Sequence, residues 1–410
     1  MNIQDTIERA LKAAGLNTES GPMRGVTETI RKALSSAGLG GATEPPRAAP
    51  GQRAPRDSDT IEVVAREVAG SAEAETPTAR ASAARKSAAA RPAETAEGQF
   101  LARSFSSAAG TRAYKLYLPP QAAKAQAKAL PMVVMLHGCT QSADDFAAGT
   151  QMNRLADQHG FLVLYPEQAA SANPSRCWNW FSPHDQVREG GEPALIAGMV
   201  EAVAAEQPVD PRRIYVAGLS AGAAMAVILG QTHPELFAAV GAHSGLPYAA
   251  AHDIPSAMAA MKGRVVMGRA HFPGTPEDPR RPATQAVPMI VFHGDRDHTV
   301  QQSNGDQIVS QALAAFTSQA GKNGLKEHRE EGTTDAGQRY TRTRHLGADG
   351  RCLVEAWALH GAGHAWSGGN AAGSYTDAKG PDASAEMLRF FLAQPAAQRH
   401  AVASTPPMGV

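Results

Sequence analysis

The stretch that decides the fold of this chain is Arg213-Ile-Tyr-Val-Ala-Gly-Leu-Ser-Ala-Gly-Ala-Ala-Met225. Its apolar run from Ile214 to Ala217 predicts a buried strand, and the composition of Ala223 to Leu229 favours a helix. Between the two lies Gly-x-Ser-x-Gly, the pattern of a nucleophile elbow, in which a serine sits on a sharp turn between a strand and a helix. The stretch therefore predicts that Ser220 is a nucleophile in an α/β fold.

The glycines of this pattern have a steric purpose. The residues two before and two after the serine crowd its backbone, and Gly218 and Gly222 have no Cβ that could clash there. The turn holds the Ser220 hydroxyl clear of the sheet, and the start of the helix directs backbone N–H groups at the group that this oxygen attacks. The alternative is a chance pentapeptide in a chain with 39 glycines, but the flanking strand and helix favour the elbow.

Composition and charge exclude several classes of protein. The chain has 410 residues with 39 basic and 39 acidic side chains, so no net field favours nucleic acid or an anionic membrane surface. No apolar run approaches the roughly 18–20 residues of a transmembrane segment, and the N-terminus lacks the basic and apolar regions of a secretory signal peptide. The sequence therefore predicts a cytoplasmic globular protein, and its hydrophobic content of 43 % is adequate for a sizeable core.

Four regions follow one another along the chain. Residues 1–40 contain an internal repeat that predicts two short amphipathic helices, which need a surface to pack on: each other, the rest of the chain, a partner protein or an apolar polymer. Residues 41–98 are rich in Ala, Pro and Arg and contain no aromatic residue, which predicts a disordered linker. A single α/β catalytic domain is expected over residues 99–394, and a flexible tail over residues 395–410.

Within the expected domain, apolar runs alternate with helical patterns. Strands are predicted at 114–118, 132–136, 161–165, 214–217, 237–240, 289–292 and 353–359, and helices at 146–159, 193–206, 223–229, 308–317 and 383–393. The first strand ends at two prolines, which is typical of an outer strand. Because alternating strands and helices imply right-handed crossovers, we expect a mostly parallel central sheet with helices on both faces.

A serine nucleophile needs a histidine base and an acid that orients the base, and in α/β-hydrolases the chain order is Ser, acid, His. The loop after the strand at 289–292 contains Asp295 and Asp297. We favour Asp297 as the acid, because Gly294 permits the turn and Val300 can re-enter the core. Asp295 is the alternative acid. The non-catalytic interpretation is that both aspartates are ordinary turn residues.

The base is expected after the last strand, where the loop contains His360 and His364. We favour His364, because its glycine-rich loop can bring an imidazole over the elbow, whereas His360 lies nearer the strand end. His137 and His293 end strands and are interpreted as structural support.

The oxyanion of the reaction needs two backbone N–H donors. The N–H of Ala221 follows the nucleophile, and that of Cys139 lies in the loop after the strand at 132–136, where Gly138 lets the backbone approach the substrate. The mechanism that follows is two-step acyl transfer, which needs no metal and no organic cofactor. The three cysteines do not have the spacing of a zinc site or a disulfide scaffold.

Five separated motifs together resemble the polyhydroxybutyrate depolymerase-type esterases. They are His137-Gly-Cys-Thr-Gln141, Cys177-Trp-Asn-Trp-Phe181, the stretch from Val209 to Gly222, Ser244-Gly-Leu-Pro247 and Gly363-His-Ala-Trp-Ser-Gly-Gly369. The resemblance covers about residues 100 to 393. It implies an α/β-hydrolase fold and a carboxylesterase with Ser220 as nucleophile, Asp297 as acid and His364 as base.

The resemblance also bears on the substrate and on two cysteines. It implies that Cys139 and Cys177 lie close together, and whether they form a disulfide stays open because a cytoplasmic protein would keep them reduced. Trp180 and Trp366 are interpreted as substrate-binding residues, together with Gln141, because aromatic rings pack well against an ester chain. Trp178 fits the substrate groove and the core equally.

The expected substrate is a polyester or oligomer of hydroxyalkanoates. Feruloyl and acetyl-xylan esterases share much of the pattern and are the alternative within the fold, and a non-catalytic binding protein on the same scaffold is the alternative from another class. The chain lacks the signal peptide and the C-terminal polymer-binding module of the secreted depolymerases, although an extracellular location is common in that family. The N-terminal helices are expected to dock on a polymer or granule surface or on a protein.

Overall fold

The computed structural model describes residues 98–123, 128–264, 286–320 and 324–395. The two helices predicted in residues 1–40, nearly all of the predicted linker and nearly all of the predicted tail lie outside the described residues. Within the described ranges, no helix is long and apolar enough to cross a membrane.

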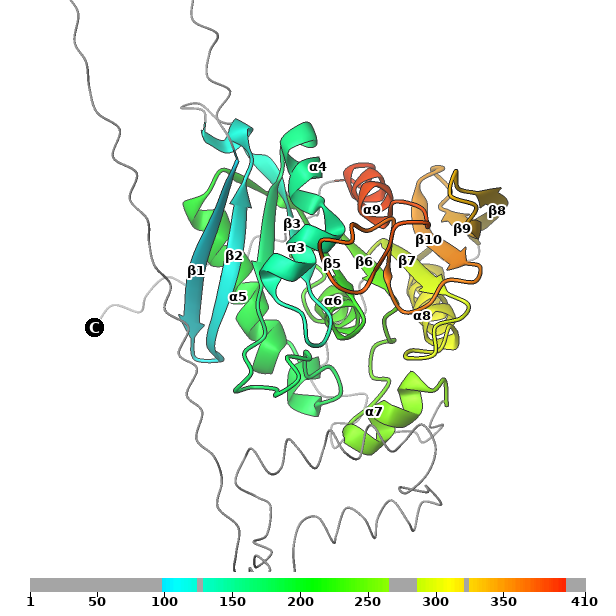
Figure 1. Cartoon of the computed structure of the whole chain (residues 1–410), viewed down its shortest axis with the longest axis horizontal. Coiled ribbons are helices and arrows are strands. Elements are labelled where there is room, and N and C mark those ends of the chain that lie inside the picture. Colours follow the sequence, from blue (N-terminus) through cyan, green and yellow to red (C-terminus); the bar gives the residue numbers. More distant parts are fainter. Residues whose placement is uncertain (1–97, 124–127, 265–285, 321–323, 396–410) are drawn as a thin grey trace, which may run out of the picture. The chain divides into compact units, whose positions relative to one another are not determined.

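Ten strands of the described chain form one sheet in the order β1-β2-β4-β3-β5-β6-β7-β10-β9-β8 (Figure 1). The strands are β1 (Gln99–Ser107), β2 (Gly110–Leu118), β3 (Leu130–Leu136), β4 (Leu162–Pro166), β5 (Val209–Leu219), β6 (Ala239–His243), β7 (Met289–Gly294), β8 (Lys326–Thr333), β9 (Arg339–Leu346) and β10 (Cys352–Leu359). A separate two-stranded ladder pairs β11 (Trp366–Ser367) with β12 (Thr376–Asp377).

The helices of the described chain lie between these strands along the sequence, except α9, which follows the last of them. They are α3 (Ala143–Thr150), α4 (Met152–His159), α5 (Gly191–Glu206), α6 (Ala221–Thr232), α7 (Ile254–Met261), α8 (Ser303–Ala320) and α9 (Ala383–Leu392), with short 3-10 turns η1 (Pro120–Ala123) and η2 (Pro183–Gln186).

The centre of the sheet is parallel, as predicted. The strands β4, β3, β5, β6, β7 and β10 pair in parallel with their neighbours in that order. Both edges are antiparallel: β1 and β2 on one side, and β9 and β8 on the other. The prediction of an outer strand at 114–118 was wrong, because β1 covers β2. The strand β8 was missed because its Lys-Glu-His-Arg-Glu-Glu-Gly-Thr sequence is exposed almost throughout and has no apolar alternation.

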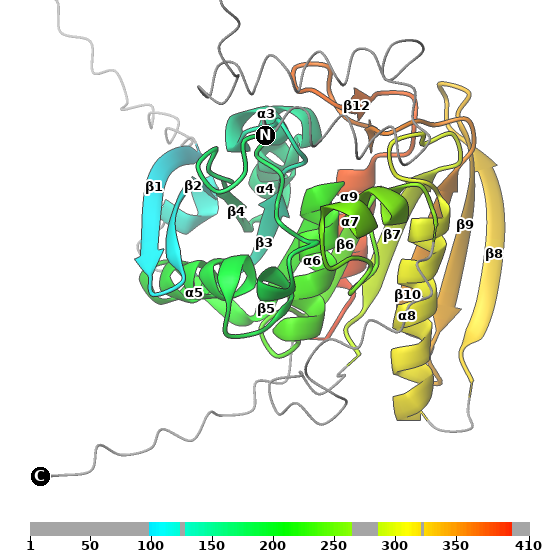
Figure 2. The ribbon, with the colours of Figure 1, turned by 90° about the horizontal axis from the view of Figure 1, so that it is seen from below.

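Helices cover both faces of the sheet (Figures 1 and 2). Apolar side chains of α5, α6 and α8 pack with one face, for example Ile196, Val227 and Ile308. The other face is covered by α3, α4 and α9, and there Tyr215 of β5 stacks on Phe391 of α9 at a ring distance of 5.0 Å. The central strands are buried on both sides, which explains their continuous apolar runs.

The single helix predicted over 146–159 was wrong. The backbone of Gln151 is left-handed, with φ 55°, so α3 ends there and α4 begins with the next residue. The N–H of Gln151 caps α3 on the carbonyl of Ala147. The apolar periodicity continues through Gln151 without a shift. Periodicity therefore cannot distinguish two helices separated by this one residue from a single unbroken helix.

Candidate active site

Ser220 occupies a strained turn at the carboxyl end of the central strand β5. Its backbone has φ 57° and ψ −118°, and its N–H donates to the carbonyl of His243 over 2.9 Å. A Cβ at Gly222 would lie 2.1 Å from the carbonyl oxygen of Leu136, and one at Gly218 would lie 2.4 Å from the backbone of Gly222. The two glycines therefore let the helix α6 pass against the end of β3, which is the steric condition for the turn.

Asp297 and His364 are joined in the loops that follow β7 and β10. The Nδ1 of His364 donates to Oδ2 of Asp297 over 2.7 Å. The other carboxylate oxygen, Oδ1, accepts the N–H groups of Thr299 at 2.9 Å and Val300 at 2.8 Å. These bonds leave Nε2 of His364 as the ring nitrogen that can exchange a proton.

Asp297 is nearly inaccessible to solvent, at 2 % exposure, yet remains a carboxylate. Burial by itself raises the pKa of Asp297, but the hydrogen bond and charge of His364 and the N–H of Val300 outweigh it and hold this pKa below its ordinary value. His293 lies beside the pair, with Nε2 3.6 Å from Oδ2 of Asp297, and donates to the carbonyl of Val300 over 2.9 Å. His293 thus supports the loop of Asp297.

The two alternative residues, Asp295 and His360, form a second pair. The Nδ1 of His360 lies 3.1 Å from Oδ2 of Asp295, and its Nε2 lies 2.8 Å from the hydroxyl of Thr341 on β9. The other oxygen of Asp295 accepts the N–H of Gly361 over 2.6 Å. Both ring nitrogens of His360 are therefore used within the protein, and the pair ties the Asp297 loop to the His364 loop.

The loop between β3 and α3 packs against the elbow. The N–H of Gly138 donates to Oε1 of Gln141 over 2.9 Å, and the Nδ1 of His137 donates to the carbonyl of Gly138 over 2.7 Å. In the described part of the chain, the N–H groups of Cys139 and Ala221 form no hydrogen bond. Both backbone donors therefore remain available to an oxygen that develops negative charge.

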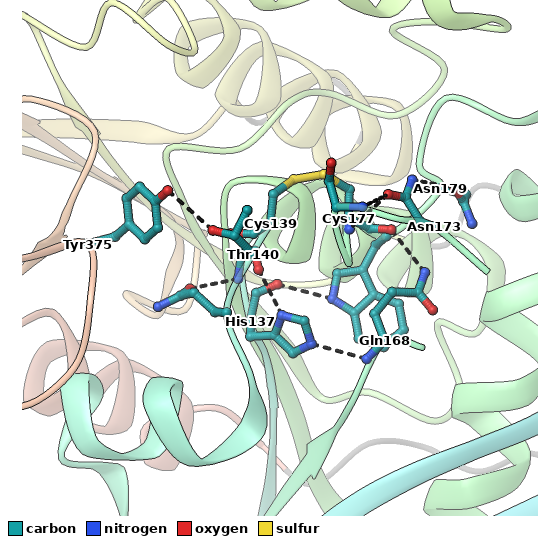
Figure 3. Close-up of a disulfide and its surroundings, with 12 residues drawn as sticks. His137, Cys139, Thr140, Gln168, Asn173, Cys177, Asn179 and Tyr375 are labelled. Atoms are coloured by element: carbon teal, nitrogen blue, oxygen red, sulfur yellow. Dashed lines mark hydrogen bonds between the residues drawn. A yellow bond between two sulfur atoms is a disulfide. The ribbon is translucent and has the colours of Figure 1, made fainter. Parts of the chain in front are cut away.

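A disulfide joins Cys139 to Cys177 (Figure 3). The same two segments are held by further bonds: the N–H of Thr140 donates to the carbonyl of Ser175 over 2.7 Å, and the indole of Trp178 donates to the carbonyl of His137 over 3.1 Å. These contacts connect the loop after β3 to the loop that precedes α5.

The three residues interpreted as substrate-binding, Trp180, Trp366 and Gln141, are buried in this structure. Trp366 is 1 % exposed, and its indole donates to Ser384 over 3.0 Å. Trp180 is 6 % exposed and packs edge-on against Phe181. The amide of Gln141 accepts from Gly138 and donates to Asp145 and Ser374, so it holds the loop together. Trp178 is likewise fully buried and belongs to the core.

Sequence reasoning missed His243, the last residue of β6, which holds the elbow through the backbone of Ser220. Its backbone carbonyl binds Ser220, its Nε2 accepts the N–H of Ser367 over 3.0 Å, and its ring stacks between Phe292 and Trp366. Burial, followed by the charges of His293 and His364, lowers the pKa of His243 to about 3. His243 directly precedes the Ser244-Gly-Leu-Pro247 motif, which was the available signal.

Among the described residues, no group of three or more His, Cys, Asp or Glu side chains is arranged to hold a metal ion. The chemical groups described at the site are the strained serine, the His–Asp pair and the two backbone donors. The structure contains no hydrogen bond from the Ser220 hydroxyl to another described residue. In unliganded enzymes such bonds often become short only when substrate is bound.

A family model and a curated relative both place the chain in one family of esterases. Residues 112–334 match the family model described as Esterase PHB depolymerase. The poly(3-hydroxyalkanoate) depolymerase C of Paucimonas lemoignei is 34 % identical over 235 residues, which cover 57 % of this chain and 54 % of that protein. Acetylxylan esterase A of Aspergillus oryzae is 29 % identical over 192 residues, 45 % of this chain and 62 % of that protein. The chain thus spans about half the length of the curated relatives it matches.

The solved acetyl xylan esterase from Aspergillus awamori superposes with a TM-score of 0.55 and 20 % identity, over 73 % of this chain and all of that structure. This similarity shows the α/β-hydrolase fold.

Proposed function

Since the chain belongs to the PHB depolymerase family of esterases, we propose that it hydrolyses carboxylic esters through Ser220, Asp297 and His364. The observation that carries the proposal is the 2.7 Å bond between His364 and the buried Asp297, on the same edge of the sheet as a serine in a strained turn. A binding protein on this scaffold would have no use for either feature.

The first step forms an acyl-enzyme. Nε2 of His364 takes the proton of the Ser220 hydroxyl as its oxygen attacks the ester carbonyl. The N–H groups of Cys139 and Ala221 stabilise the oxyanion, and Asp297 stabilises the imidazolium. When the tetrahedral intermediate collapses, the alkoxide leaves with the proton from His364. In the second step His364 takes a proton from a water molecule as its oxygen attacks the acyl-enzyme carbonyl. His364 then returns the proton to Ser220, and the carboxylic acid is released.

We propose esters of hydroxyalkanoates, as polymer or oligomer, as the substrate. The depolymerase of Paucimonas lemoignei supports this choice, because it is more similar to this chain than the acetylxylan esterase over a longer stretch. A plant-polysaccharide ester is the second candidate, supported by a feruloyl esterase B of Neurospora crassa that is 36 % identical over 119 residues, 29 % of this chain and 40 % of that protein.

We further propose that the protein works in an oxidising compartment outside the cytoplasm, because structural disulfides such as Cys139–Cys177 are rare in reduced cytosol. The N-terminal repeat would then hold the catalytic domain at a polymer surface. The role of the N-terminal repeat rests on the proposed esterase activity, whereas the compartment rests on the disulfide.

The test uses a fluorophosphonate probe and two substrates. The wild-type chain should be labelled at Ser220, and Ser220→Ala should lose labelling and about 10⁶-fold in kcat while its thermal unfolding is unchanged. Comparing the turnover of hydroxybutyrate oligomers with that of methyl ferulate shows which acyl group the enzyme prefers. An unlabelled wild type without esterase activity would favour the non-catalytic alternative.

A further inference from the structure

One aromatic side chain of the described residues is strongly exposed beside the site. Tyr375 is 47 % exposed and is the one aromatic among the large apolar side chains that the described chain leaves at its surface, the others being Val187, Ile254, Met258 and Leu392. The tryptophans of the site region are buried instead. Tyr375, rather than Trp180 or Trp366, is therefore the strongly exposed aromatic side chain in this part of the described chain.

Tyr375 lies between the two loops on which the proposed chemistry depends. Its phenol oxygen lies 3.3 Å from the hydroxyl of Thr140, the residue after Cys139 (Figure 3). Thr140 uses its own proton to donate to the carbonyl of Cys139 over 2.6 Å, so the phenol is the donor to Thr140. On the other side, the carbonyl of Tyr375 accepts the N–H of Trp366, two residues after His364, over 2.7 Å.

The backbone around Tyr375 is fixed by neighbouring bonds. The N–H and hydroxyl of Ser374 both donate to the carboxylate of Asp145, over 2.9 and 2.6 Å, and Gln141 donates to the carbonyl of Ser374 over 3.1 Å. These contacts hold the residue before Tyr375 against α3 and against the loop that carries Cys139. The ring is thus presented on a rigid support rather than on a free loop.

The backbone conformation of Tyr375 is one that the stability of the fold does not favour. Its φ is 52°, a left-handed conformation that glycine adopts freely and that a bulky side chain adopts rarely. Thr140, its hydrogen-bond partner, has φ 67°. A glycine at position 375 would relieve the strain, and the exposed ring gains little from burial. Strain of this kind, held by surrounding contacts, is typical of functional sites.

We propose that Tyr375 is a specificity-determining residue whose ring contacts the hydrocarbon part of the ester on the side of the Cys139 loop. An aromatic face packs favourably on an aliphatic chain, and the backbone bonds on either side of Tyr375 position the ring. This inference rests on the proposed esterase function and names a contact for its substrate.

The experiment measures the chain-length dependence of kcat/KM for Tyr375→Ala and Tyr375→Phe. The substrates are an acyl series, p-nitrophenyl acetate to octanoate, and an alcohol series, ethyl to octyl acetate. In one of the two series, Tyr375→Ala should lower the ratio of long-chain to short-chain kcat/KM about tenfold. Tyr375→Phe, which keeps the ring and loses the hydroxyl, should retain the wild-type ratio within about twofold.

A purely structural role predicts a different pattern. If Tyr375 only fastens the loop through Thr140, Phe and Ala will lower kcat/KM equally for every chain length, and the proposal is overturned. Unchanged ratios in both series overturn it as well. Leu392→Ala, which removes a similarly exposed apolar side chain at the end of α9, is the matched control and should keep the wild-type ratios. An inactive wild type would instead refute the proposed esterase function.

Discussion

Asp295 and His360 lie 3.1 Å apart, between Oδ2 and Nδ1, and form a second aspartate–histidine pair beside that of Asp297 and His364. The two pairs differ in burial and in the partners of their histidines. Asp297 is 2 % exposed, and the Nε2 of His364 has no hydrogen-bond partner among the described residues. The side chains of Asp295 and His360 are each 33 % exposed, and Thr341 occupies the second nitrogen of His360. We propose that the first pair exchanges a proton with Ser220, whereas the second pair connects the two loops.

We therefore expect the two aspartates to differ sharply when each is replaced by asparagine. Asp297→Asn should lower kcat about 10⁴-fold, because an amide no longer fixes the tautomer of His364 or stabilises the imidazolium. Asp295→Asn should cost no more than about fivefold, since a hydrogen bond between partly exposed side chains contributes about 1 kcal/mol. Steady-state kinetics on one soluble ester compare them, and the reverse ranking would transfer the acid role to Asp295.

The buried His243 predicts a loss of stability in acid. Its pKa is lowered from 6.5 to about 3 in the folded protein, so it stays neutral while the unfolded chain takes up a proton below pH 6.5. The folded state should thus lose about 2 kcal/mol of unfolding free energy between pH 7.5 and pH 5 from this group alone. Stability is retained above pH 6.5 and falls as the pH drops.

Urea unfolding at the two pH values measures this effect. His243→Gln, whose amide oxygen can still accept the N–H of Ser367, should show a smaller pH dependence than the wild type by that amount, whatever its stability at pH 7.5. His328→Gln, which changes an exposed histidine of β8, should behave as the wild type does. An equal loss in wild type and His243→Gln would show that other groups cause the acid sensitivity.

The disulfide predicts the number of reactive thiols and a contribution to stability. Unreduced, unfolded protein should react at Cys352 alone, and reduced protein at all three cysteines. Because the bond closes a loop with a sequence separation of 38, Cys177→Ser should lower the free energy of unfolding by about 4 kcal/mol. Cys352→Ser is the control that leaves the bond intact. Three reactive thiols before reduction would exclude the disulfide.

The N-terminal region should be dispensable for catalysis. Every residue of the proposed site lies beyond position 130, so deletion of residues 1–95 should leave kcat/KM for a small soluble ester unchanged. If the repeat in residues 1–40 binds a polymer surface, hydrolysis of insoluble substrate should fall, because the tether no longer raises the effective concentration of the enzyme. A lower melting temperature together with lost activity on the soluble ester would instead assign these residues to the stability of the domain.

The sequence alone determined the features that act over a few residues. The apolar run before Gly218 and the small residues around Ser220 predicted a strand, a turn and a helix, because backbone sterics decide such a turn locally. The parallel centre of the sheet followed from the alternation of apolar runs and helical patterns. The break at Gln151 and the charged strand β8 left no signal in that periodicity.

Tertiary structure decided which distant side chains meet. Asp297 bonds His364 across 67 residues of sequence, while Asp295 takes His360, and the order of the residues had left both choices open. Trp366 is inside because α9 supplies Ser384 to its indole, and Tyr375 is outside because its loop is fastened 235 residues away at Thr140. A pattern of residues reports which side chains are apolar or reactive. Their burial and pairing depend on how separate elements pack, and that information lies in the folded chain.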